Sequence, residues 1–467
     1  MHNMKKILCI FLYCITSFNT FAHDSPVKVL RVPNANNVYG RIDPKTSKGS
    51  VHYLGTFNTT EECEKECIKQ VERCWSYTHH SSKFTGYEGQ CFGRIEELLW
   101  SPMKEMGINS GRILWPCRSN MDCSLNGECL NGMCKCDQAW MLHNCDELNL
   151  LKADKNTGYK QMDDGEPTSS WGGPVIRDPI DGTYHMFPAE MTRHCGINSW
   201  TVNSRIVHAV SETPLGKYKR IEEQQPPFAH EPDVINGPRG EAIMYWSAME
   251  HKNNDTLCNC SDGSTPPSCK PGLVTFTTYM SMAARPKGPW SEPVVVFPTA
   301  PGDNNFAMVI LKNGTLIGFN RVGKWGTSGS RIHLVRAESY LDPSTYKQNP
   351  DELWPLLPAA GTEDPFMYMD KRGNFHAIFH NMYPSDIQEN CGGHAYSPDG
   401  INWQYGGRAF GNKVQFTDGT EFEFTRRERP HFVFDKDGVT PLALTSGAQY
   451  GGKYNDACYT LLQPINH

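Results

Sequence analysis

The sequence predicts a mainly β fold, in which a five-bladed β-propeller follows two small disulfide-rich modules. Three observations favour it. A Pro-to-Gly pattern recurs five times after residue 150, 12 of the 18 cysteines lie before that residue, and the later region lacks long helical patterns. A chain of 467 residues is long enough for two to four domains.

The N-terminus predicts export. Met1–Lys6 is a short cationic start, Ile7–Phe21 is apolar, and Ala22 ends a small-residue cleavage site, so residues 1–22 are expected to be a signal peptide. A membrane anchor is the alternative, but the stretch is shorter than the roughly 20 apolar residues of a span. We therefore expect a secreted, extracellular protein without a transmembrane segment. Surface N-glycosylation is expected at the four sequons, Asn58, Asn254, Asn259 and Asn313.

The net charge of the chain bears on which class of macromolecule the protein can bind. The formal net charge is −6 and the chain has no long basic run, which argues against a nucleic-acid partner.

Residues 35–115 predict a first disulfide module. Its cysteines are Cys63, Cys67, Cys74 and Cys91. Thr59-Thr60-Glu61-Glu62 predicts a helix N-terminus, and the first two cysteines then share one helix face. The pattern resembles a PAN/apple-like module, with an unclassified disulfide-bonded subdomain as the alternative.

Residues 116–148 contain six cysteines within about 30 residues, which allow fifteen pairings. Their spacing, together with the turns Asn126-Gly127 and Asn131-Gly132, resembles an EGF-like domain. The resemblance implies the pairs Cys117–Cys129, Cys123–Cys134 and Cys136–Cys145. The acidic residues expected before Cys117 of a calcium-binding member are missing, so no metal is assigned.

Residues 150–467 repeat one hairpin unit. A Pro, or Phe in the third copy, is followed eight residues later by a turn Gly and then by an apolar strand. The copies are Pro174/Gly182, Pro232/Gly240, Phe306/Gly314, Pro365/Gly373 and Pro430/Gly438. Five units of about 60 residues indicate a five-bladed β-propeller, since the alternative, a two-sheet sandwich, does not need registered copies.

The residue before each repeated Pro occupies one column around the expected channel. That column is Gly173, Glu231, Asn305, Asp364 and Arg429. Because alternate strand residues share a face, its neighbours, such as Glu363 and Glu428 one step earlier, are expected to point the other way. Converging polar side chains suit a polyhydroxylated ligand.

Two facing carboxylates are what glycoside hydrolysis requires, so Glu231 and Asp364 are the candidate catalytic pair. Arg429 is expected to lower the pKa of one acid, and Asn305 to hold a sugar hydroxyl. The alternative is structural: the acids bond strand amides or pair with Arg427 and Arg429.

The blade openings His230-Glu231-Pro232-Asp233, Glu363-Asp364-Pro365-Phe366 and Glu428-Arg429-Pro430-His431 resemble family-43 glycoside hydrolases. The resemblance implies a five-bladed propeller acting on furanosides and related glycans, with Glu231 replacing a second-blade Asp that orients the acid. The chain departs from the family pattern twice. Gly172-Gly173 stands where the family has its general base, and Asn304-Asn305 where it has its general acid.

Several side chains are secondary candidates. Asp233, His431 and Trp171 are candidate substrate-binding residues, although core packing is the commoner role for a tryptophan. His376, His380 and His394 are candidates for a sugar or a channel cation, with a structural role as the alternative. The pairing of six cysteines stays open, with a zinc site as the alternative for some: Cys195, Cys258, Cys260, Cys269, Cys391 and Cys458.

Two functions follow. The first is a secreted glycoside hydrolase-like protein acting on an extracellular glycan. The second is a non-catalytic matrix or adhesion protein that binds a glycan or glycoprotein. Two carboxyl groups in an open pocket favour the enzyme, whereas acids neutralised by arginines favour the binder.

Overall fold

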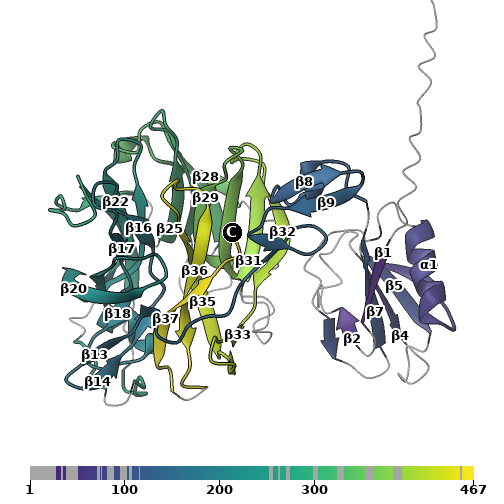
Figure 1. Cartoon of the computed structure of the whole chain (residues 1–467), viewed down its shortest axis with the longest axis horizontal. Coiled ribbons are helices and arrows are strands. Elements are labelled where there is room, and N and C mark those ends of the chain that lie inside the picture. The colour runs from purple at the N-terminus through teal and green to yellow at the C-terminus, as the bar shows by residue number, and fades with distance from the viewer. Residues whose placement is uncertain are drawn as a thin grey trace, which may run out of the picture.

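The computed structural model describes most of the chain (Figure 1). The described residues are 28–32, 35–37, 51–70, 74, 76–80, 89–94, 102–104, 108–114, 116–251, 256–260, 263–269, 274–297, 303–322, 331–352, 362–381, 392–452 and 455–467. The expected signal peptide, Asn254 and Cys391 lie outside them. The architecture is mainly β and propeller-like.

The N-terminal module is a five-stranded sheet with one helix. The sheet order is β1 (Lys28–Val32), β7 (Ile108–Leu114), β4 (Ser76–His80), β5 (Gln90–Arg94) and β3 (Val51–Thr56); β2 (Ala35–Asn37) pairs with β6 (Pro102–Lys104), and α1 is Thr60–Gln70. Thr59 caps the helix, because its hydroxyl accepts the Glu62 N–H while the Glu62 carboxylate accepts the Thr59 N–H. Cys63–Cys91 joins the helix to the sheet, and Cys67–Cys74 closes a shorter loop.

The second module has three disulfides, Cys117–Cys129, Cys123–Cys134 and Cys136–Cys145, which are the pairs that the EGF-like resemblance implies. Its elements are η1 (Asn120–Cys123), β8 (Gly127–Leu130), β9 (Met133–Cys136), β10 (Trp140–Met141) and β11 (Glu147–Leu148).

This module packs against the fourth sheet of the propeller region (Figure 1). Arg372 donates to the Asp137 carboxylate at 3.1 Å and to the Leu125 carbonyl at 2.7 Å, and the Trp140 and His394 ring centroids are 4.5 Å apart. The two parts therefore share one hydrophobic core.

Five antiparallel units, called blades 1 to 5 here, make up the rest of the described chain. Blade 1 contains β16 (Val175–Arg177), β17 (Tyr184–Met186), β18 (Ala189–Met191), β15 (Ser170–Trp171), β19 (Ser204–Ser211) and β20 (Lys217–Gln225). Blade 2 is β21 (Ala229–Asn236), β22 (Ala242–His251), β23 (Val274–Ala283) and β24 (Val294–Val295). Blade 3 is β25 (Asp303–Ile310), β26 (Leu316–Val322), β27 (Arg331–Ala337) and β28 (Lys347–Glu352). Blade 4 is β29 (Thr362–Met369), β30 (Phe375–Asn381), β31 (Gly392–Ser397) and β32 (Gln404–Phe410). Blade 5 is β35 (Arg426–Phe434), β36 (Pro441–Gln449), β37 (Cys458–Pro464) and β12 (Gly158–Tyr159).

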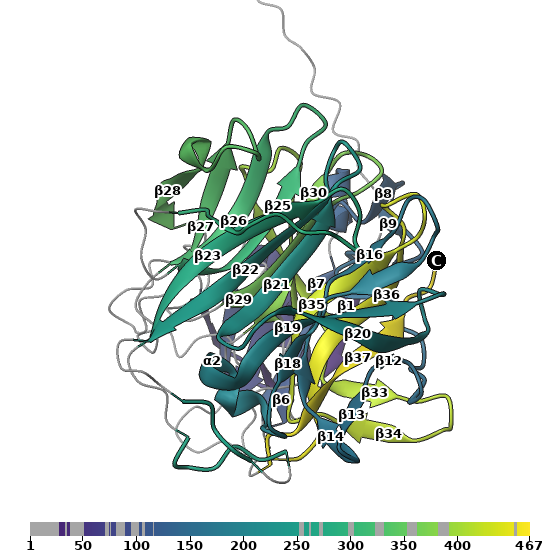
Figure 2. The same ribbon diagram turned by 90° about the vertical axis from the view of Figure 1, so that its left-hand side faces the viewer.

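The first strand of each unit lines a common axis (Figure 2). Strand β16 contacts β21, β21 contacts β25, β25 contacts β29, β29 contacts β35, and β35 contacts β16 again, so the circle is closed. Strand β12 completes blade 5 by pairing antiparallel with β37, and it also pairs parallel with β20 of blade 1. An early segment of the chain thereby joins the last blade to the first.

The described blades also carry two short hairpins and three short helices. These are the hairpins β13 (Gln161–Asp163) with β14 (Glu166–Thr168) and β33 (Lys413–Gln415) with β34 (Glu421–Glu423), and the short helices η2 (Ile197–Ser199), α2 (Trp200–Asn203) and η3 (Pro343–Thr345). Hydrophobic clusters fill the space between neighbouring blades, as between blades 3 and 4, where Phe319, Phe379 and Tyr405 pack together.

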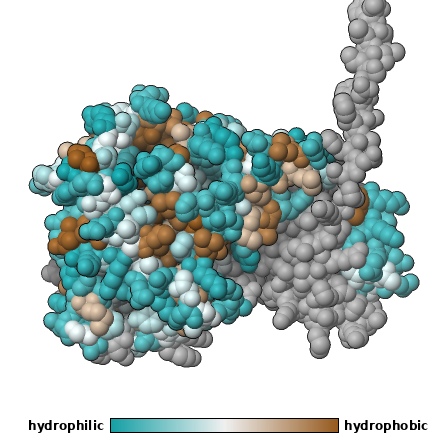
Figure 3. Space-filling model, in the orientation of Figure 1, coloured by the Kyte–Doolittle hydropathy of each residue, from teal (hydrophilic) through white to brown (hydrophobic). Residues whose placement is uncertain are grey.

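The face in Figure 3 is mostly hydrophilic, with scattered brown patches. None of the described helices is long and apolar enough for a bilayer span.

Candidate functional site

Four inner strands carry the same local distortion. The pairing register shifts at Glu231 in β21, Asn305 in β25, Asp364 in β29 and Arg429 in β35, and each of these residues has a positive φ of 51–57°. A bulge of this kind redirects a side chain out of the strand alternation. With Gly173 of blade 1 they form what we call the hub ring, the column that the sequence predicts.

The ring side chains bond to one another. Asn305 donates from Nδ2 to Asp364 Oδ1 at 3.1 Å, and its backbone N–H donates to Glu231 Oε2 at 3.1 Å. Arg429 donates to Asp364 Oδ1 at 3.0 Å and to the Pro232 carbonyl at 3.2 Å. Glu231 also accepts the Ser247 hydroxyl at 2.9 Å. The fold thus brings the predicted acids together, and each accepts two hydrogen bonds from within the chain on one of its two carboxylate oxygens.

The two acids are poorly accessible. Glu231 is 8% exposed and Asp364 is 7% exposed. Burial raises the pKa of Asp364, while the charge of Arg429 opposes that rise. Arg429 is itself buried, so its ion pair with Asp364 has little screening by solvent.

The glycines of blade 1 make room for Arg429. A Cβ built on Gly172 would lie 2.8 Å from Arg429 Cγ, and Gly172 has a φ of +62°. The Arg429 side chain therefore occupies the space that a larger residue at position 172 would need. Sequence reasoning noted the glycines but missed this packing role.

A second polar group lies beside the ring. His380 donates from Nδ1 to Glu363 Oε1 at 3.0 Å, and its Nε2 is 3.6 Å from Glu428 Oε1. Arg321 of β26 is 2.9 Å from the other oxygen of Glu363. We call Glu363, His380 and Glu428 the acid–His cluster.

Proximity of the acid–His cluster to Asp364 corrects one expectation. Strand alternation predicts that Glu363 and Glu428 point away from the ring, but ligand atoms of Glu363, Asp364, His380 and Glu428 all lie within 4.8 Å of one another. The bulge at Asp364 is the physical reason, since its left-handed backbone breaks the alternation. The simple face rule was therefore wrong at the hub.

In the acid–His cluster, the neighbours of His380 and of Glu363 favour the charged form of each side chain. Burial alone would lower the pKa of His380, but Glu428 and Glu363 raise it to about 9. Burial alone would raise the pKa of Glu363, but the hydrogen bond from His380 and the charge of Arg321 lower it below its usual range. The carboxylate and imidazole atoms of this cluster could hydrogen-bond a sugar, and in the neutral form of His380 they could also ligate a cation.

The other side chains that the sequence offers as candidates belong neither to the hub ring nor to the acid–His cluster. Asp233 and His431 meet at 3.6 Å, and burial raises the pKa of Asp233 to about 7. His376 and His394 form a buried pair, at 3.1 Å between Nδ1 and Nε2. Trp171 is 3% exposed in a hydrophobic cluster, which corrects the expectation of a ring face offered to sugar. Asp233, His431 and Trp171 are all buried, and of the three only His431 lines the cavity at the propeller axis.

Four of the six cysteines whose pairing the sequence left undecided form disulfides. Cys195 bonds Cys260 and Cys258 bonds Cys269, which corrects the zinc alternative there, while Cys458 is buried and has no disulfide partner within the described part of the chain. Of the sequon asparagines within the described residues, Asn58, Asn259 and Asn313 are exposed.

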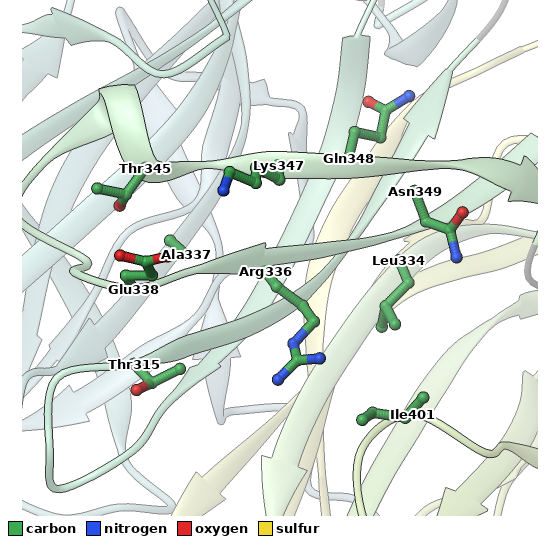
Figure 4. Close-up of a pocket in the computed structure, with 10 residues that line it drawn as sticks. All are labelled: Thr315, Leu334, Arg336, Ala337, Glu338, Thr345, Lys347, Gln348, Asn349 and Ile401. Carbon is green, nitrogen blue, oxygen red and sulfur yellow. The ribbon is translucent and has the colours of Figure 1, made fainter.

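One cavity lies at the propeller axis next to the hub ring, and another lies away from it. One, of about 390 Å³, is lined by inner strands of all five blades beyond the bulges, with Phe366, Tyr368 and Phe432 among its walls. The other, of about 610 Å³, lies on the outer part of blade 3 (Figure 4).

Comparison with known proteins gives structural likeness only. No protein-family profile matches the chain, and no curated protein is similar in sequence. A family 117 glycoside hydrolase of Zobellia galactanivorans is 13% identical with a TM-score of 0.46, over 71% of this chain and 92% of that one. An α-L-arabinofuranosidase of Podospora anserina, solved with cellotriose, is 12% identical with a TM-score of 0.45, over 69% and 99%. A thermostable family-43 glycoside hydrolase is 11% identical with a TM-score of 0.39, over 64% and 88%. The likeness is one of propeller fold.

Proposed function

We propose that this protein is an extracellular carbohydrate-binding propeller that holds a glycan at the acid–His cluster and does not cleave it. The observation that carries the proposal is the internal pairing of the hub ring. Asp364 is bonded to Arg429 and Asn305, and Glu231 to Ser247 and Asn305. Both carboxyl groups are also buried, with Glu231 8% and Asp364 7% exposed, whereas a general acid or a nucleophile needs an oxygen at hydrogen-bond reach of the substrate.

The acid–His cluster supplies sugar-binding chemistry. The Glu363 side chain is 20% exposed and that of Arg321 is 16% exposed, so both are more open than the ring acids. Carboxylates accept hydroxyl protons, and the guanidinium donates to sugar oxygens. The partner we infer is therefore a neutral or hydroxyl-rich glycan.

An oxidising compartment agrees with this role. Seven disulfides are present among the described residues, and such bonds persist outside the cytosol. A second module that resembles an EGF-like domain and packs on blade 4 suits an adhesion or matrix protein. The signal peptide that the sequence predicts and the exposed sequon asparagines are in keeping with secretion.

A second candidate function is glycoside hydrolysis at the same end of the channel. One observation favours it: burial raises the pKa of Asp364, while His380 and Arg321 lower that of Glu363. Two neighbouring carboxyls with pKa values pushed apart are the arrangement of an acid with an ionised partner. In this alternative Asp364 protonates the leaving oxygen and Glu363 stays ionised.

A combined glycan array and hydrolysis screen tests both functions. The wild type is compared with Glu363→Gln and Asp364→Asn, and with Glu166→Gln on exposed β14 as the matched control. Binding that Glu363→Gln weakens at least about ten-fold, without turnover in any variant, supports the binder. Turnover that Asp364→Asn abolishes and Glu166→Gln retains replaces it with the hydrolase.

A further inference from the structure

The cavity of about 610 Å³ on blade 3 is a groove between two blades (Figure 4). Its lining comes from β27 and the residue after it, from η3 and β28, and from the turn before β26, while Ile401 of blade 4 also lines it. We call it the blade 3 groove. It is separate from the hub ring, which no residue of its lining belongs to.

Two cations stand directly opposite each other in this groove. Arg336 of β27 is the register partner of Lys347 of β28, so both side chains project from the same face. Both are exposed, and their charged ends point in different directions along the groove (Figure 4). Like charges directly opposite on neighbouring strands destabilise a sheet.

Neither cation has a charged partner in the part of the chain that the structure describes. Other arginines on blade faces do. Arg220 pairs with Asp163 at 2.6 Å, Arg285 with Asp178 at 2.7 Å and Arg408 with Glu147 at 2.6 Å. The groove therefore holds positive charge that the fold neutralises elsewhere, and an anionic ligand would remove the repulsion.

The rest of the lining suits a sugar. Thr315, Thr345 and Asn349 offer hydroxyl and amide groups, and Leu334 with Ile401 offers apolar surface. Sugar rings present hydroxyls at their edges and C–H groups on their faces, so a mixed lining of this kind matches both. Glu338 is the single acid in the groove, which leaves one net positive charge.

We propose that the blade 3 groove is a second binding site, and that it takes an anionic oligosaccharide whose carboxylate or sulfate groups pair with Arg336 and Lys347. The site goes beyond the proposed function, because it uses a different surface and a charged ligand. Its occupation does not depend on what the acid–His cluster binds.

Titration calorimetry of the full-length protein tests the proposal. The probes are an oligogalacturonate, a heparin-derived oligosaccharide and a neutral cello-oligosaccharide as control. Saturable binding of at least one anionic probe, weakened by added salt, is expected. The probe that binds more tightly tells carboxylate from sulfate.

Variants locate the binding. Arg336→Gln with Lys347→Gln should weaken the anionic probe at least about ten-fold, since charge-assisted hydrogen bonds are lost. The matched control, Lys219→Gln with Lys371→Gln, removes two exposed charges elsewhere and should change affinity less than about two-fold. Glu338→Gln removes the repelling acid and should tighten binding, an effect that a merely structural residue would not produce.

Two results would overturn the site: no saturable binding of either anionic probe, or binding that the double groove variant leaves unchanged. Glu363→Gln separates this outcome from a failure of the proposed function. It should leave the anionic probe unaffected, because the acid–His cluster lies at the hub and not in the groove.

Discussion

Among the described residues, the charged side chains of the hub ring bond to other residues of that ring, whereas the two cations of the blade 3 groove are not paired with an acid. At the hub, buried Arg429 lies 3.0 Å from Asp364, and Asn305 joins Asp364 to Glu231. In the groove, exposed Arg336 and Lys347 lie at opposite positions of neighbouring strands, and neither has an acid partner among the described residues. A buried charge needs a partner within the chain, whereas an exposed charge remains available to bind a ligand. Polar residues that converge at the axis of a propeller are therefore weak evidence for catalysis.

Removing the hub cation should give the largest effect on stability. Arg429→Met leaves Asp364 buried without its charged partner, and we expect a loss of about 3–5 kcal/mol in the free energy of unfolding. Denaturant titration measures it. The double variant Arg429→Met with Asp364→Asn should recover part of the loss. No recovery would mean that Arg429 acts through packing alone.

The pH dependence of stability sharpens the account of the acid–His cluster. The pKa of His380 is raised to about 9, above an unfolded value of about 6.5. Its contribution is therefore fully present below about pH 6.5 and is lost as the pH rises towards 9, on the order of 3 kcal/mol. Unfolding at several pH values, with His380→Gln as reference, measures the difference. Parallel curves for both proteins would contradict the assignment.

The glycine at the hub should be sensitive for a steric reason. Gly172→Ala adds a Cβ against Arg429 at a position with φ of +62°, and about 1–3 kcal/mol of stability should be lost. Gly373→Ala is the matched control, because its φ is +86° but nothing lies within 4 Å of the added carbon. Equal losses would assign the whole effect to the backbone and none to Arg429.

Of these changes, removing a groove cation should have the smallest effect on the free energy of unfolding, and it should not lower that free energy as the hub variants do. Arg336→Gln relieves the repulsion of Lys347, so the unfolding free energy should stay constant or rise by about 0.5 kcal/mol. The same denaturant titration measures it at low salt. A loss above about 1 kcal/mol would show that Arg336 is bonded within the fold, and it would remove the contrast with the hub.

The fold was largely predictable because its signal is repeated. The Pro-to-Gly spacing placed all five inner strands, and the same register placed Glu231, Asn305, Asp364 and Arg429 in one column. The three disulfides of the second module agree with the pairs that its resemblance to an EGF-like domain implies, although spacing alone left fifteen pairings open.

The chemistry of the site was not predictable to the same degree. The acid–His cluster depends on Glu363 lying opposite His380 across β29 and β30, a pairing that the bulge shifts. The blade 3 groove was missed altogether, because β28 carries no repeated signature and its pairing with β27 is irregular. Cross-strand register between distant residues is a tertiary property.

The most direct test of the central claim, that the hub acids stabilise the propeller and do not catalyse, compares two readouts on Asp364→Asn. We predict that this variant unfolds at lower denaturant than the wild type and that neither protein hydrolyses any glycan that it binds. A wild type that turns over a bound glycan, and an Asp364→Asn variant of unchanged stability that does not, would contradict the account.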